Sequence, residues 1–233
     1  MDYAELVAKL QEVKKKGYVP THRQGDTGIG KTLEDLVGIK ENNVPGPDCN
    51  MVELKSARAG GLSMLTLFTK QPLPRKVALS TLINQFGYPS KKNGEKILHT
   101  TIKSHCFTNI KGKASLSIKV TDKIEIISVN GSALGYWDDE ILRPAFEKKL
   151  PAVMFARALA RGKRPNEEFW FNEVWYLKEF SFENFKKVVD EGIVCVDLRI
   201  GQYPDGRPHD HGTGFRIKKD RLDACFATRK RVI

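Results

Sequence analysis

The segment at residues 47–55, PDCNMVELK, constrains the fold more than any other part of this 233-residue chain. Residues two apart in a β-strand point to the same face of a sheet. A strand here would therefore bury Leu54 and present Glu53 and Lys55 together on the opposite face. Asp48 follows a proline just upstream, in a turn that can bring its carboxylate back beside them.

Two carboxylates and an ammonium group at one point are suited to metal-dependent cleavage of phosphodiester bonds. The oxygens of Asp48 and Glu53 would bind Mg²⁺, which stabilises charge on the phosphate, and Lys55 would position or deprotonate a water molecule. A solvated strand edge with a Glu-x-Lys pair is the competing interpretation, and such edges are common. The spacing alone leaves both open.

The composition indicates a soluble protein with a substantial core. The chain is 40% hydrophobic and 29% charged, and no apolar run approaches the ~18 residues of a membrane helix. Its first residues form an amphipathic pattern that contains acids, which is not typical of a signal peptide. The four cysteines are scattered without a C-x-x-C pair, so we expect a reducing cytoplasm and neither a zinc cage nor a disulfide framework.

The net charge of +11 is unevenly distributed along the chain. Residues 59–130 contain 11 basic and 3 acidic side chains, and residues 191–233 contain 9 and 6. The basic excess thus follows the Asp48–Lys55 cluster and recurs at the C-terminus. A polyanion such as DNA is the partner that this charge favours, although a merely basic soluble protein would look similar.

Hydrophobic periodicity predicts an α/β fold, with one compact unit built on a central mixed sheet. Thr32 is expected to cap the second helix and Gly38 to end it, and Asn130-Gly131 to form a hairpin turn. The expected helices are 2–16, 32–37, 77–86, 137–149 and 182–191. The expected strands are 51–57 paired with 62–69, a meander of 97–103, 115–120 and 123–129, and then 152–160, 168–177, 194–200 and 215–218.

Residues 25–32, GDTGIGKT, match the P-loop pattern for nucleotide binding letter by letter. A P-loop requires a buried strand before the glycines and a long helix after them. Here residues 18–24 are polar and broken by a proline, and the following helix is short. We therefore expect no bound nucleotide. The segment would instead bring Lys31 to a DNA phosphate and Glu34 to the acidic cluster.

A second group of chemically active side chains lies between Val196 and Lys218. Arginine is the strongest direct reader of guanine O6 and N7, and aspartate can accept from cytosine N4. The β-loop-β segment could therefore read G·C pairs through Asp197, Arg199, His209, Asp210, His211 and Arg216.

Other interpretations of this group remain open. The His-x-His pair could bind a transition metal, but no third ligand has suitable spacing. It could belong to an HNH-type nuclease, yet the further His or Asn on a following helix is not found. The histidines could also be ordinary loop residues.

Four segments in consistent order resemble the MvaI/BcnI family of type II restriction endonucleases, in the MutH-like branch of the PD-(D/E)xK nuclease superfamily. The resemblance spans nearly the whole chain, and its glycine loop and HDHG sequence are the most specific parts. The segments are TGIGKTLEDL (27–36), PDCNMVELK (47–55), LTLFTK (65–70) and VDLRIGQY with PHDHGTGFRI (196–217).

This resemblance implies a restriction-endonuclease-like core and a DNA-recognition lobe within one nuclease domain, residues 1–233. Residues 1–130 would be mainly catalytic and residues 131–233 mainly involved in recognition. The implied enzyme is a bacterial or archaeal Mg²⁺-dependent endonuclease, with one or two ions per site. It would clasp double-stranded DNA as a monomer and nick each strand of a CC-N-GG site in turn.

Roles are carried over by motif. Asp48, Glu53 and the backbone carbonyl of Leu54 would bind metal, and Lys55 would serve the attacking water. Glu34 matches an acidic residue that MutH-like nucleases bring from the N-terminal helix. The base-reading region corresponds to Asp197, Arg199, His209, Asp210, His211 and Arg216, and Lys31 and Lys70 are expected at the DNA backbone.

The central base pair is only weakly indicated. The HDHGT loop is nearer to the MvaI branch, which accepts A·T, whereas TTIK (100–103) and the NNV sequence before Asp48 are nearer to the BcnI branch, which accepts G·C. We lean to CC(A/T)GG. A MutH-like repair nickase and a non-catalytic sequence-specific DNA-binding protein remain the alternatives.

Overall fold

The computed structural model describes residues 2–39, 52–61, 64–91, 94–112 and 115–233. Within these ranges no helix is both long and apolar enough to cross a membrane. The chain divides into two compact units. Unit 1 comprises residues 1–64, 147–181 and 218–233, and unit 2 comprises residues 65–146 and 182–217. Both units are therefore discontinuous, whereas the sequence predicted one compact unit with contiguous lobes at 1–130 and 131–233.

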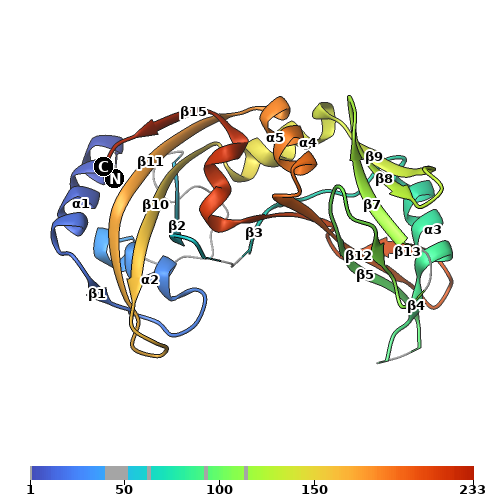
Figure 1. Ribbon diagram of the computed structural model, residues 1–233, viewed down its shortest axis with the longest axis horizontal. Helices are drawn as coiled ribbons and strands as arrows, with labels where there is room; N and C mark the ends of the chain where they lie inside the picture. The colour runs from blue at the N-terminus through green and yellow to red at the C-terminus, as the bar shows by residue number, and fades with distance from the viewer. Residues whose placement is uncertain (1, 40–51, 62–63, 92–93, 113–114) are drawn as a thin grey trace. The chain divides into compact units, whose positions relative to one another are not determined.

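Unit 1 contains a mixed five-stranded sheet, shown with its helices in Figure 1. The strand order is β1-β11-β10-β2, with β15 on β11, and only the β10–β2 pairing is parallel among these pairs. The elements are α1 (Tyr3–Lys15), β1 (Val19–Pro20), α2 (Gly28–Val37), β2 (Glu53–Arg58), β10 (Ala152–Arg161), β11 (Glu168–Phe180), the 3₁₀ helix η1 (Lys219–Cys225) and β15 (Phe226–Arg231).

One face of this sheet is covered by α1 and α2. The buried cluster joins Leu10 of α1 and Leu33 of α2 to Leu54 of β2 and Met154 of β10. Burying each such side chain contributes roughly 1.5–3 kcal/mol to stability. Because Leu54 points into this cluster, its strand neighbours on either side must point away from it.

Unit 2 contains two further sheets. One has the order β3-β14-β12-β5-β4, with β13 on β12, and the other is the antiparallel meander β6-β7-β8-β9. The elements are β3 (Met64–Thr69), α3 (Arg75–Phe86), β4 (Tyr88–Pro89), β5 (Lys96–Ile102), β6 (Thr108–Asn109), β7 (Ser115–Val120), β8 (Ile124–Ser128), β9 (Ala133–Trp137), α4 (Asp139–Lys149, whose last turn belongs to unit 1), α5 (Phe182–Asp190), β12 (Val194–Gln202), β13 (Pro208–Asp210) and β14 (Gly214–Lys218).

Aromatic side chains form the centre of unit 2. Phe215 of β14 stacks on Phe68 of β3 with ring centroids 4.9 Å apart, and it meets Trp137 of β9 edge-on at 5.0 Å. The Trp137 indole also donates to the Lys70 carbonyl at 3.0 Å. These contacts hold β3 and β9 to the strand that carries Arg216.

Most predicted elements are present, but several details were wrong. The predicted 51–57 and 62–69 strands do not pair: β2 pairs with β10, and β3 belongs to the sheet of unit 2. The 97–103 strand pairs with β12 and lies outside the meander, which β9 completes through the predicted turn at Gly131. Trp137 ends β9, where it pairs with Ile124 of β8, so the helix predicted from 137 begins only at Asp139.

The second helix also differs from its prediction. It begins at Gly28 and so includes Thr32, which was expected to cap it. Thr32 is fully buried, and its hydroxyl donates to the Gly28 carbonyl at 2.8 Å and accepts from the His22 N–H at 2.9 Å. The predicted end is confirmed, since Gly38 has the left-handed φ of 79° that favours glycine.

Candidate active site

Glu53 and Lys55 lie side by side on β2, on the face of the sheet opposite α1 and α2. Leu54 between them is only 4% exposed, as its alternation predicted. The Lys55 ammonium donates to a Glu53 carboxylate oxygen, and the two side chains are 27% and 16% exposed. The alternating pattern therefore produces a partly shielded ion pair on one face.

The neighbouring strand fixes this pair in place. In the parallel register, Val153 of β10 lies beside Glu53 and Phe155 beside Lys55. Both apolar residues are almost fully buried. The Glu53–Lys55 pair therefore has buried apolar residues as its neighbours on the side of β10.

The predicted metal ligands are hard oxygen donors, which suit Mg²⁺. Glu53 offers its carboxylate and Leu54 its carbonyl, while Asp48 lies outside the described residues. Glu34 is on α2, which packs against β2, and is partly exposed. Within the part of the chain that the structure describes, no three His, Cys, Asp or Glu side chains gather as a metal site. This donor set fits a divalent ion only when Asp48 is added to it.

The segment that resembles a P-loop is helical from Gly28 onward. The Lys31 N–H is hydrogen bonded to the Thr27 carbonyl at 3.1 Å, and the Lys31 ammonium to the Asp35 carboxylate at 2.7 Å. A phosphate cradle needs backbone N–H groups that turn around the anion. The Lys31 ammonium is instead held by Asp35 of the same helix, and its side chain is partly shielded from solvent.

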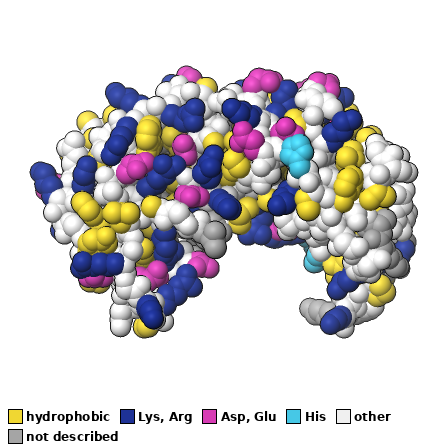
Figure 2. Space-filling view, in the orientation of Figure 1, with side chains coloured by type: hydrophobic (Ala, Val, Ile, Leu, Met, Phe, Trp, Pro, Cys, Tyr) yellow, Lys and Arg dark blue, Asp and Glu magenta, His cyan; other side chains and the backbone are white. Residues whose placement is uncertain are grey.

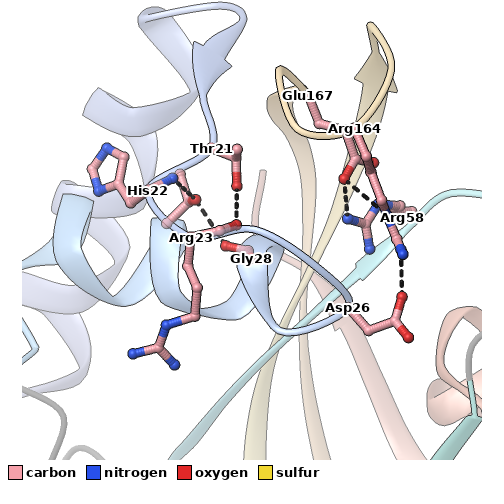
Figure 3. A network of polar contacts seen from close by, with 9 residues as sticks. Thr21, His22, Arg23, Asp26, Gly28, Arg58, Arg164 and Glu167 are labelled. Atoms are coloured by element: carbon pink, nitrogen blue, oxygen red, sulfur yellow. Dashed lines mark hydrogen bonds and ion pairs between the residues drawn. The ribbon is translucent and has the colours of Figure 1, made fainter.

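A polar network ties the loop before α2 to the end of β2 (Figure 3). Arg58 donates twice to the Glu167 carboxylate, at 3.0 and 2.9 Å, and both side chains are largely shielded from water. Arg164 pairs with Asp26 in that loop and lies 3.5 Å from Glu167. Its hydrogen bond holds the pKa of Asp26 below the usual range. The network therefore holds the approach to α2 against the strand that carries Lys55.

Asp197 on β12 organises the second group of predicted residues. Its Oδ2 accepts from Arg199 Nε at 3.0 Å and Nη2 at 2.7 Å, and lies 3.5 Å from Nη1 of Arg216. Its Oδ1 accepts from the Thr101 hydroxyl at 3.0 Å. Asp197 is 14% exposed, whereas Arg199 is 49% exposed. The carboxylate thus orients two arginines, which keep donors facing solvent.

His209 and His211 form a contact of their own, with 2.7 Å between their Nε2 atoms. His209 also stacks on Tyr203 at 4.1 Å between ring centroids. Desolvation and then the neighbouring His211 lower the pKa of His209. Gly201 makes this packing possible, because a Cβ there would lie 2.7 Å from the His211 ring.

Asp210, between the two histidines, closes the turn that follows. Its Oδ1 accepts from the Gly212 N–H at 3.0 Å, and from the N–H and hydroxyl of Thr213 at 2.7 and 2.9 Å. The Thr213 carbonyl in turn accepts from the Lys70 N–H at 2.8 Å. In this arrangement Asp210 shapes the loop, and Lys70 lies directly beside it.

The sequence profile of the MvaI/BcnI restriction endonuclease family matches residues 7–226. The chain belongs to this family. It is therefore a type II site-specific deoxyribonuclease, an enzyme of a group that generally uses divalent metal ions.

Solved structures agree with the family. The chain is 28% identical to the restriction endonuclease MvaI in a complex with its cognate DNA substrate, with full coverage of both chains and a TM-score of 0.69. It is 27% identical to MvaI in the absence of DNA, over 100% of this chain and 99% of the other, again with a TM-score of 0.69. No curated protein is significantly similar.

In this MvaI/BcnI endonuclease the predicted residues fall in separate units. Glu34, Glu53 and Lys55 belong to unit 1, and the Asp197 group belongs to unit 2. Most of the basic segment 59–130 also belongs to unit 2. The basic excess of this segment therefore lies mostly in the same unit as the Asp197 group. Its position in the sequence, directly after the Asp48–Lys55 cluster, had suggested that it would lie with the Glu53–Lys55 pair. Lys and Arg side chains are interspersed with acids over the face drawn in Figure 2.

Several residues beside the Asp197 group and the histidine pair were not predicted from the sequence. Thr101 and His99 lie on β5, in register with Asp197 and Arg199. Tyr203 and Gly201 support the histidine pair. A lone Thr or Gly carries no sequence signal for such a role, although Tyr203 within the GQYPDG segment could have been expected to stack.

Proposed function

We propose that this endonuclease is Mg²⁺-dependent and cleaves both strands of CC(A/T)GG as a monomer, nicking them one after the other in the cytoplasm of a bacterium or archaeon. The Glu53–Lys55 pair on β2 is the observation that carries the proposal. It provides a metal-binding carboxylate and a cation on one partly shielded face. A monomer with one such centre must act twice to cut a duplex.

The residues divide the chemistry between them. Asp48, Glu53 and the Leu54 carbonyl would hold one or two Mg²⁺ ions, which would stabilise negative charge on the phosphate when bound. Lys55 would orient the attacking water and help to neutralise the phosphate. Glu34 on α2 would orient Lys55 or a water molecule from beside the edge of the sheet, since α2 packs against β2 and β2 is the last strand in the order β1-β11-β10-β2.

Base reading is assigned to the Asp197 group. Arg199 and Arg216 would each donate to O6 and N7 of a guanine, which is the commonest specific contact in the major groove. Asp197 would hold both guanidinium groups in the required orientation. His209 on the adjacent β13 and His211 just after it would contact the same site.

Digestion of a plasmid in Mg²⁺ tests the proposal, followed by sequencing of the fragment ends. Discrete fragments that all end within CC(A/T)GG are expected, and nicked circles should precede linear DNA. Fragments ending within CC(G/C)GG would overturn the central pair. Plasmid that stays nicked with excess enzyme would point to a repair nickase, and intact plasmid with a sequence-dependent mobility shift to a non-catalytic DNA-binding protein.

A further inference from the structure

Two lysines outside the sequence motifs approach the Glu53–Lys55 pair from different elements of unit 1. Lys149 is the last residue of α4, and β10 begins soon after it, at Ala152. Val153 of β10 then lies beside Glu53 in the sheet. Lys219 is the first residue of η1, which packs against β2.

Arg157 anchors η1 on the face that carries the ion pair. In the parallel register Arg157 lies beside Ala57, so it shares the face of Lys55 two residues away. Its Nη2 donates to the Asp220 carbonyl at 2.6 Å and to Asp223 Oδ1 at 2.8 Å. Lys219 directly precedes Asp220, so this anchor places the lysine near Lys55.

The electrostatic neighbours of both lysines support this placement. Burial, then Lys55, lowers the pKa of Lys149, while Glu53 opposes the shift. Burial, then Arg58, lowers the pKa of Lys219; Asp26 opposes that shift and Lys55 adds to it. The two opposing acids already have partners, since Glu53 pairs with Lys55 and Asp26 with Arg164. Both lysines therefore lie within electrostatic reach of Lys55, on the side of unit 1 that carries the Glu53–Lys55 pair.

We propose that Lys149 and Lys219 bind phosphates of the cleaved DNA strand next to the bond that is cut, and so position that strand over Glu53 and Lys55. The inference rests on the proposed function. A phosphodiester fits because it is an anion that cations from separate elements can contact at successive phosphates. The two lysines are positioning residues, distinct from the Arg199 and Arg216 base readers.

Neutral substitutions with matched controls test the inference. Lys149→Gln and Lys219→Gln are compared with Lys148→Gln and Lys218→Gln, which remove the same charge from the position directly before each lysine. Single-turnover cleavage is measured in Mg²⁺, and binding of a cognate duplex is measured in Ca²⁺ over a range of salt concentrations.

Each test variant should cleave about tenfold more slowly, the effect of losing one charge-assisted contact. Its slope of log affinity against log salt should fall by about 1. The control variants should change neither quantity by more than about twofold. Lys149→Arg and Lys219→Arg keep the charge and should recover most of the cleavage rate, which separates charge loss from misfolding.

A duplex with neutral methylphosphonates next to the cut bond provides a second measurement. This change should weaken binding by the wild type more than binding by either Gln variant. The Gln variants already lack the lysine–phosphate contact that the methylphosphonate removes. Equal losses in all proteins, or equal effects of test and control substitutions, would overturn the inference while leaving the nuclease intact. A wild type that neither cuts nor binds DNA would overturn the proposed function and the inference with it.

Discussion

Arg199 donates two hydrogen bonds to the carboxylate of Asp197, which lies two residues before it on β12. The same carboxylate lies 3.5 Å from Arg216 on β14. Both arginines therefore depend on one acid for their orientation. An isolated arginine on a strand would sample many rotamers, and fixing it on DNA would reduce the affinity.

Asp197→Asn should weaken sequence discrimination at two guanines at once. Asn keeps the shape of the side chain but loses the charge that holds both guanidinium groups. The cost should be about 1–3 kcal/mol at each guanine position. Binding of a cognate duplex and of duplexes with single base-pair changes, measured in Ca²⁺, would show it.

Asp205→Asn is the matched control for this experiment. Arg207 donates to Asp205 at 2.7 Å with the same two-residue spacing, but its side chain is 78% exposed. Removing this exposed pair should leave discrimination unchanged. A similar loss in both variants would mean that the Asp197 substitution acts through general charge and not through orientation.

Lys55→Ala should abolish cleavage and spare specific binding. The lysine is the cation beside Glu53, so its loss removes the group that we propose serves the attacking water, and cleavage should slow by about 10²–10⁴-fold. Single-turnover rates in Mg²⁺ and affinities in Ca²⁺ separate the two effects. Lys178→Ala on β11, an exposed position, should retain the wild-type rate.

Gly28→Ala and Gly30→Ala should have opposite effects on stability. A Cβ at Gly28 would lie 2.2 Å from the Arg23 carbonyl oxygen, a backbone atom, so overpacking should cost about 1–3 kcal/mol. A Cβ at Gly30 meets only Glu34 Oε1 at 3.9 Å, and alanine should stabilise the helix by up to ~1 kcal/mol. Urea denaturation measures both, and the reverse order would contradict a helix that begins at Gly28.

Stability should fall as the pH drops below about 6.5 because of His209. Desolvation, and then His211, lower the pKa of His209 from its ordinary 6.5, so the fold favours the neutral imidazole. The unfolded chain then binds more protons on acidification, and the stabilisation that is complete above 6.5 is lost as the pH falls. His209→Phe, which keeps the stack on Tyr203, should show a flatter curve in denaturation between pH 7 and pH 5. Superimposable curves would rule out this contribution.

Local features of the candidate site were accessible from the sequence. The alternation around Leu54 predicts that Glu53 and Lys55 share a face, because side chains alternate in any strand. The same rule places Asp197 and Arg199 together on β12. The helix end at Gly38 and the hairpin turn at Gly131 follow equally from backbone conformations that favour glycine.

Strand partners were not accessible in this way. Residues 51–57 were predicted to pair with the next strand along the chain, 62–69. Instead β2 pairs with β10, about a hundred residues later. Backbone hydrogen bonds can form between β2 and many other apolar strands. Which strand becomes its partner depends on which faces can be buried together. Here Leu54 completes the cluster beneath α1 and α2, and Met154 of β10 belongs to the same cluster.

The sequence by itself therefore determined the family, the α/β class and the residues of the Glu53–Lys55 pair, since each follows from short motifs or from local periodicity. Only the tertiary structure decided that one acid serves both Arg199 and Arg216, that His209 stacks on Tyr203 and meets His211 edge-on, and that Lys149 and Lys219 come near Lys55. These relationships join segments far apart in the chain. They depend on strand register and on the packing of η1 and β10, which are set by the burial of whole faces and not by any short run of residues.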